Sequence, residues 1–134
     1  MIYHVRIVTL AQADMRDIYI YIAETLQNPA AAVRRIALID KTILSLKNNP
    51  DRIPLVRNNY LASKGYRMTI AKNHLVFFII REDEKIVSIM RVLYGRRDWM
   101  RVLKVEHENK DVVANDEALA DWLLPEDEDA WQNL

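Results

Sequence analysis

Polar and apolar residues alternate at the start of the chain and then change to helical spacing. Residues 2–8 alternate as expected for a half-buried strand. From Thr9 to Leu26, apolar residues recur every three or four positions and give one apolar helix face. Thr9 can cap the first turn, because Gln12 lies three residues later in the position of a capping box. We therefore expect a strand followed directly by an amphipathic helix.

A second helical pattern occupies residues 30–47. Asn28 suits the N-cap of this helix and Pro29 its first position, whereas Pro50 follows its end. Because so few residues join the two helices, we expect an antiparallel helical hairpin that packs on a sheet.

The second half of the chain is rich in strand patterns. A loop with two prolines over 50–64 leads into three short apolar or alternating runs, separated by polar turns. These runs are 66–71, 74–80 and 86–94, and they predict a β-meander. After Gly95, residues 96–104 return to helical spacing, with Trp99 and Leu103 one turn apart. The predicted order is β-α-α-β-β-β-α, an α+β fold with a two-helix hairpin packed on a small antiparallel sheet.

The formal net charge is zero, but the charges are unevenly distributed. Residues 1–105 contain 18 Lys and Arg against nine Asp and Glu, whereas residues 106–134 contain one Lys against ten acids. This division predicts a basic body that binds a polyanion, an acidic interaction tail, or both. A merely solubilising extension is the alternative. Short helices are predicted in the tail, and their apolar side chains need a surface to cover: Leu119, Trp122, Leu123, Trp131 and Leu134.

Several kinds of chemistry find no support in the sequence. The chain has no cysteine, and its three histidines are widely separated, so no metal site is expected. Its two glycines are isolated, so no phosphate-binding loop and no cofactor are expected. The N-terminus lacks the apolar core of a signal peptide, and no apolar run approaches the ~18 residues of a membrane span. We expect a cytoplasmic protein that does not bind membranes.

The remaining candidate chemistry is basic. Five arginines fall on the predicted meander or directly after it: Arg67, Arg91, Arg96, Arg97 and Arg101. An arginine within a strand is costly to bury unless its guanidinium meets a carboxylate or a phosphate. These arginines therefore form either a surface for nucleic acid or an acidic protein, or a set of ion pairs with Asp98 and the acidic tail. The spacing alone leaves both interpretations open.

The motifs and their order resemble the RelE/ParE superfamily of bacterial toxin–antitoxin toxins over about residues 2–104. The resemblance rests on Ala13-Asp14 to Tyr21-Ile22, on Lys64-Gly65-Tyr66-Arg67, on Asn73-His74, and above all on RVLYGRRDW at 91–99. The last string is typical of the ParE-like branch, often described as plasmid-stabilisation proteins. The family fold is a two-helix hairpin on a small antiparallel sheet, as the pattern itself predicts.

The resemblance implies two possible targets. RelE-like members cleave mRNA on the ribosome without a metal and stabilise the developing phosphorane charge with cationic residues, to which Arg67 and Arg97 correspond. ParE-like members instead poison DNA gyrase. The aromatic acid/base of RelE-like enzymes falls near Leu103, which cannot transfer a proton. We therefore favour gyrase inhibition, with an endoribonuclease and a non-toxic interaction domain as alternatives.

The resemblance also implies a cognate antitoxin as a partner, and the tail itself looks like part of one. Residues 121–134 combine acids with two tryptophans, as in the antitoxin segment that covers a toxin's basic site. We expect 1–105 to be the toxin domain and 106–134 to bind it, in cis or in trans.

Overall fold

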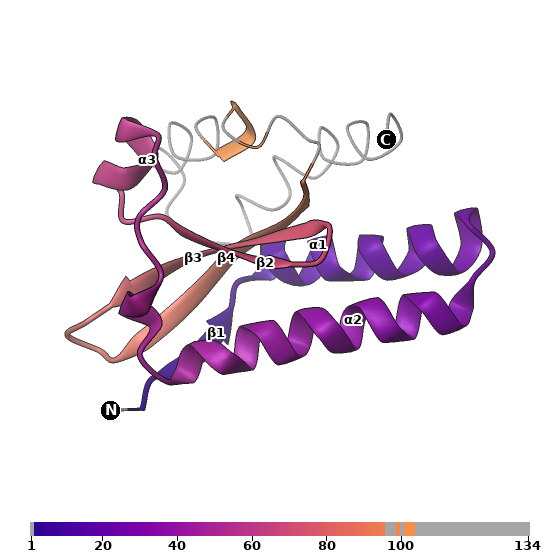
Figure 1. Ribbon diagram of the computed structural model, residues 1–134, viewed down its shortest axis with the longest axis horizontal. Helices are drawn as coiled ribbons and strands as arrows, with labels where there is room; N and C mark the ends of the chain where they lie inside the picture. The colour runs from indigo at the N-terminus through magenta and orange to yellow at the C-terminus, as the bar shows by residue number, and fades with distance from the viewer. Residues whose placement is uncertain (1, 96–98, 100, 104–134) are drawn as a thin grey trace.

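A four-stranded sheet in the order β1-β4-β3-β2 forms the centre of the computed structural model, which describes residues 2–95, 99 and 101–103 (Figure 1). The strands are β1 (His4–Ile7), β2 (Arg67–Ala71), β3 (His74–Arg81) and β4 (Ile86–Tyr94). The meander of β2, β3 and β4 is antiparallel, as predicted. The whole sheet is mixed rather than antiparallel, because β1 pairs with β4 in parallel. A parallel pair needs a long crossover, which the helical hairpin and the meander provide together.

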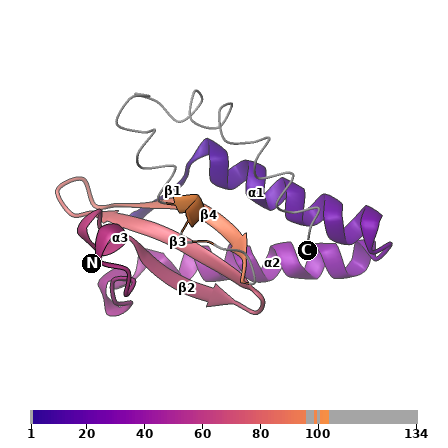
Figure 2. The ribbon, with the colours of Figure 1, turned by 90° about the horizontal axis from the view of Figure 1, so that it is seen from above.

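Two long helices cover one face of this sheet. They are α1 (Thr9–Ile20), which continues as a π-helical turn (Tyr21–Thr25), and α2 (Pro29–Leu44), which ends in the 3₁₀ turn Ser45–Lys47. Figure 1 shows the two lying side by side below the strands, and Figure 2 shows the strands crossing over α2. The predicted α+β class and the helical hairpin are therefore confirmed.

The two predicted helix starts differ in outcome. Asn28 caps α2, since its side-chain oxygen accepts a hydrogen bond from the Ala31 N–H at 3.1 Å. The capping box at Thr9 is wrong, because α1 already includes Thr9 and has no side-chain cap. Gln12 instead donates from Nε2 to the carbonyl of Ile7 at 2.8 Å. This bond ties the first turn of α1 to the end of β1.

The predicted loop over 50–64 contains local structure that its sequence does not reveal. It forms the 3₁₀ turn Pro50–Arg52 and a short helix, α3 (Asn59–Ser63). Asn58 caps α3 by accepting a hydrogen bond from the Leu61 N–H at 3.0 Å. Gly65 follows at a φ of +89°, which glycine adopts without strain. A single turn is too short to show helical periodicity, so the pattern could not predict α3.

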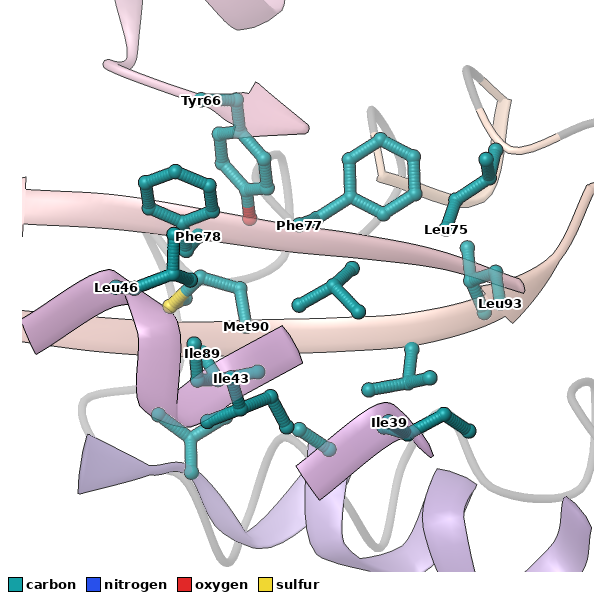
Figure 3. Close-up of a cluster of buried hydrophobic side chains, with 14 of the residues drawn as sticks. Ile39, Ile43, Leu46, Tyr66, Leu75, Phe77, Phe78, Ile89, Met90 and Leu93 are labelled. Carbon is teal, nitrogen blue, oxygen red and sulfur yellow. The ribbon is translucent and has the colours of Figure 1, made fainter. Parts of the chain in front are cut away.

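The core fills both faces of the sheet. Figure 3 shows Ile39 and Ile43 of α2 on one side of the strands, with Tyr66 and Phe77 on the other. All four are almost completely buried, and they belong to one continuous cluster. The central strands β3 and β4 are therefore apolar on both faces, which explains why they appear in the sequence as apolar runs and not as alternating ones.

The chain after β4 returns to helix, as far as it is described. Residues 99 and 101–103 are helical, Trp99 packs on Phe77 at a ring-centroid distance of 5.1 Å, and Leu103 is fully buried. Gly95 donates from its N–H to the Asn73 carbonyl at 2.8 Å, and a Cβ at Gly95 would lie 3.2 Å from that oxygen. The predicted return to helix is confirmed at these described residues, and Trp99 and Leu103 attach the segment to the core. The tail predictions for Leu119, Trp122, Leu123, Trp131 and Leu134 lie outside the described residues.

Candidate functional site

Arg91, one of the five candidate arginines, forms a buried ion pair with Asp14 and not with the expected Asp98 or tail. Its guanidinium donates from Nε to Asp14 Oδ2 at 2.6 Å and from Nη2 to Asp14 Oδ1 at 2.8 Å. The same Asp14 Oδ2 accepts the backbone N–H of Val92 at 2.9 Å. Both side chains are buried, with exposed fractions of 0% and 1%. Arg91 therefore joins α1 to β4 and does not belong to an accessible basic surface.

The strand geometry beside Arg91 is irregular. Phe77 pairs with Arg91 and Phe78 with Ile89, so that β4 has one extra residue, Met90, at this point. Such a bulge changes the direction in which neighbouring side chains point and increases the local twist. We infer that it helps to aim Arg91 at Asp14 of α1.

The other four arginines differ in environment. Arg67 begins β2 and is half-buried; its Nη1 donates to the carbonyls of Ile53 and, at 3.4 Å, of Asp51. Arg101 is exposed on the final helical segment. Arg96 and Arg97 lie outside the described residues. Among the described residues, a basic surface thus retains Arg67 and Arg101 as candidates.

A second group of polar side chains meets at the end of the sheet where β3 begins and β4 ends. Arg35 of α2 lies with its Nη1 3.1 Å from Nδ1 of His74, the first residue of β3. The His74 ring meets the ring of Tyr94, the last residue of β4, edge to face at 5.7 Å. His74 and Tyr94 are register partners in the sheet, so the ladder itself brings their side chains together.

These three side chains line a cavity of about 300 Å³. Its apolar wall comes from the end of α1 and the π-helical turn, through Ile18, Ile22 and Leu26. Burial and the neighbouring Arg35 guanidinium lower the pKa of His74 to about 4. His74 is therefore neutral at pH 7, and its Nδ1 must accept the hydrogen bond because Arg35 can only donate. We call this cavity the Arg35 pocket.

The sequence does not single out Arg35 of the pocket or Asp14 of the buried ion pair as site residues. Arg35 was one of two adjacent arginines on α2, and nothing local distinguishes it from exposed Arg34. Asp14 carried a clearer signal, because Leu10, Asp14 and Ile18 follow one another at four-residue spacing and all three are buried. A carboxylate on an apolar helix face indicates a buried cationic partner, and a strand arginine was available.

The described part of the chain offers no group of three or more His, Cys, Asp or Glu side chains that could hold a metal ion. Within the same residues, no helix is both long and apolar enough to span a membrane.

Comparisons with solved structures identify chains of similar fold. The fold is similar to a chain of the toxin–antitoxin complex RelBE2 from Mycobacterium tuberculosis, with 20% identity, a TM-score of 0.53, and coverage of 70% of this chain and 99% of that one. It is also similar to a chain of the chromosomal ParDE system from P. aeruginosa, with 18% identity, a TM-score of 0.58, and coverage of 69% and 96%. A comparison with curated proteins finds no match.

A family model gives the assignment that these distant likenesses cannot give by themselves. The model that describes the ParE toxin of the type II toxin–antitoxin system parDE matches residues 5–99. This range runs from β1 through the hairpin and the meander to Trp99, and so includes the buried Asp14–Arg91 pair and the Arg35 pocket. The chain belongs to the ParE toxin family of type II toxin–antitoxin systems.

Proposed function

We propose that this chain inhibits bacterial growth by binding DNA gyrase, and that it does not cleave RNA. The observation that carries the proposal is the full burial of Leu103, near which the resemblance to RelE-like ribonucleases implies an aromatic acid/base. A buried leucine can neither donate nor accept a proton. Growth inhibition would then come from binding through a surface of the toxin domain, with Arg67, Arg96, Arg97 and Arg101 as the candidate contacts.

Possible substitutes for that acid/base are poorly suited to proton transfer. His74 is only 4% exposed, and its lowered pKa of about 4 makes it a weak base. Tyr66 is buried, and burial raises its pKa. Tyr94 packs against His74 in the Arg35 pocket, where its neighbours are α1 and α2. These placements support a binding role over a catalytic one.

A metal-independent endoribonuclease is the second candidate function. Arg67 favours it, because two backbone carbonyls hold this guanidinium in place at the start of an edge strand. A positioned cation can stabilise the charge of a phosphorane-like transition state. In that case Arg67 and Arg97 would be the catalytic residues. A non-toxic interaction domain is the third candidate.

We further propose a cognate antitoxin as a partner. The structures similar to this chain are toxin–antitoxin complexes, which supports an antitoxin in trans. The charge division supports a second, internal mode, since residues 106–134 carry a net charge of −9 and residues 1–105 a net charge of +9. On this proposal residues 106–134 bind the toxin domain in cis or in trans and reduce its toxicity.

Inducible expression in bacteria tests the proposal. Residues 1–105 should stop growth, with DNA damage and inhibited gyrase supercoiling but intact mRNA. Full-length protein should be less toxic. Cleaved mRNA, with cleavage lost in Arg67→Ala, would establish the ribonuclease instead.

Matched arginine variants distinguish binding through a specific surface from a general effect of positive charge. Arg101→Ala should weaken gyrase inhibition at least severalfold, whereas Arg34→Ala, which removes another exposed arginine on α2, should leave it unchanged. Equal loss in both variants would indicate a non-specific charge effect. A soluble 1–105 fragment with no effect on growth, DNA or mRNA would leave the non-toxic interaction domain.

A further inference from the structure

The Arg35 pocket has the size and lining of a binding site. Its volume of about 300 Å³ lies at the lower end of the range for ligand pockets. One wall is apolar and the other carries Arg35, Asn73, His74 and Tyr94. Part of the apolar wall belongs to the π-helical turn Tyr21–Thr25, a backbone irregularity often found at functional sites. The ribonuclease and gyrase proposals do not use this pocket.

The pocket carries a positive charge that no described residue neutralises. Arg35 contacts the neutral His74 ring, and no carboxylate among residues 2–95, 99 and 101–103 forms an ion pair with it. A half-buried guanidinium without a carboxylate is a favourable place for an anionic group, because charge-assisted hydrogen bonds to arginine are strong. The occupant should therefore combine a carboxylate with an apolar group.

The surroundings of the pocket indicate a peptide and not a small molecule. Leu26, which lines the pocket, is 55% exposed. Ile20 and Val33, at the same end of the helical hairpin, are 42% and 57% exposed. Exposed apolar side chains that continue beyond a cavity point to a partner larger than the cavity. Figure 1 shows the connection between α1 and α2 at this end of the hairpin.

We propose that residues 126–134 of this same chain, EDEDAWQNL, dock here, with Trp131 in the pocket and the preceding carboxylates around Arg35. The proposal deepens the proposed function, because it gives a location to the inhibitory tail. Segment 126–129 is four consecutive acids, separated from the indole of Trp131 by Ala130 alone, and this combination matches both the charge and the apolar wall of the pocket. Tryptophan is also the residue most often found as an interface anchor, and its ring can stack on a guanidinium.

The length of the chain permits this docking. From Leu103, the last described residue, 28 residues lead to Trp131. Such a segment can span up to roughly 90 Å when extended, whereas a domain of this size has a radius of gyration of only about 13 Å. A tethered segment also binds at an effective concentration of about millimolar, so a weak intrinsic affinity is sufficient.

NMR on the full-length chain tests the proposal. We expect nuclear Overhauser effects (NOEs) from the Trp131 indole to the methyl groups of Ile18, Ile22 and Leu26. The intensities of these NOEs, relative to those within the indole ring, should not change on tenfold dilution. Arg35→Gln should abolish most of their intensity and shift the Trp131 indole N–H resonance. Arg34→Gln, one residue earlier and exposed, should change neither.

Several outcomes would overturn the proposal. Equivalent NOEs from Trp122 would assign the pocket to a different segment, and NOEs that weaken on dilution would indicate docking between chains. Binding of indole-3-acetate to the full-length chain without any tail NOE would make this a small-molecule site. Should Arg35→Gln fail to fold, Leu26→Asp on the exposed rim provides the same test.

The docking and the proposed function can fail separately. NOEs between Trp131 and the pocket together with a harmless 1–105 fragment would support docking and contradict toxicity. A toxic fragment without these NOEs would support the toxin and overturn this docking site.

Discussion

Asp14 and Arg91 illustrate how one pair of residues can fix the relation between a helix and a sheet. Burial of either charge alone is costly, and three hydrogen bonds to Asp14 compensate for that cost. Arg91→Met should destabilise the protein by about 3–5 kcal/mol in urea unfolding, because the Asp14 carboxylate stays buried without its partner. Lys85→Met, which breaks the exposed Lys85–Glu82 pair, should cost far less, because water already solvates both charges.

The double variant Asp14→Leu/Arg91→Met distinguishes the contribution of the ion pair to stability from that of the hydrogen bond to the backbone. It should recover much of the stability lost in Arg91→Met, since no charge remains buried. Recovery should be incomplete, because the Val92 N–H loses its acceptor. Equal costs for Arg91→Met and Lys85→Met would show that burial of the pair has no energetic consequence.

His74 should make the stability of the protein dependent on pH over a defined range. Its folded-state pKa of about 4 lies below the ordinary value of 6.5, because burial and Arg35 disfavour the imidazolium. The unfolded chain therefore binds the proton more tightly, and stability is lost as pH falls from 6.5 toward 4, by up to about 3 kcal/mol. His74→Asn, whose amide oxygen can still accept from Arg35, should reduce this loss in urea titrations. The exposed His4→Asn is the matched control; an equal reduction there would contradict the role of His74.

At the scale of elements, the start of α2 tests whether the N-cap predicted from the sequence stabilises the helix. The Asn28 cap supplies an acceptor to the Ala31 N–H, so Asn28→Ala should cost about 1 kcal/mol in thermal or urea unfolding. Asn28→Asp should retain most of the stability, because its carboxylate also accepts this bond and suits the positive end of the helix dipole. Equal losses in both variants would show that the cap does not stabilise α2.

The sequence predicted the elements better than it predicted their contacts. Long periodic segments such as α2 and apolar runs such as β4 can be recognised in the sequence. Burial on one or both faces determines their pattern of apolar positions. The parallel pairing of β1 with β4 joins residues about 80 positions apart, and no local pattern reports it. The same holds for Arg91, whose sequence pattern allows either a surface or an ion pair, because its partner Asp14 lies 77 residues away. The Arg35 pocket likewise depends on α1, α2 and the sheet meeting at one end.

At the scale of the whole molecule, the acidic tail should screen the basic body from polyanions. Converting Glu126, Asp127, Glu128 and Asp129 to their amides changes the net charge from zero to +4. If the tail covers basic surface, this variant should bind heparin and DNA more tightly, with affinity falling steeply as salt rises. Conversion of Glu24, Asp40, Asp83 and Glu84, four exposed acids of the body, gives the same net charge and is the control. The tail variant should elute from heparin at the higher salt concentration. Equal elution would mean that net charge alone governs retention, and that the tail does not shield the body.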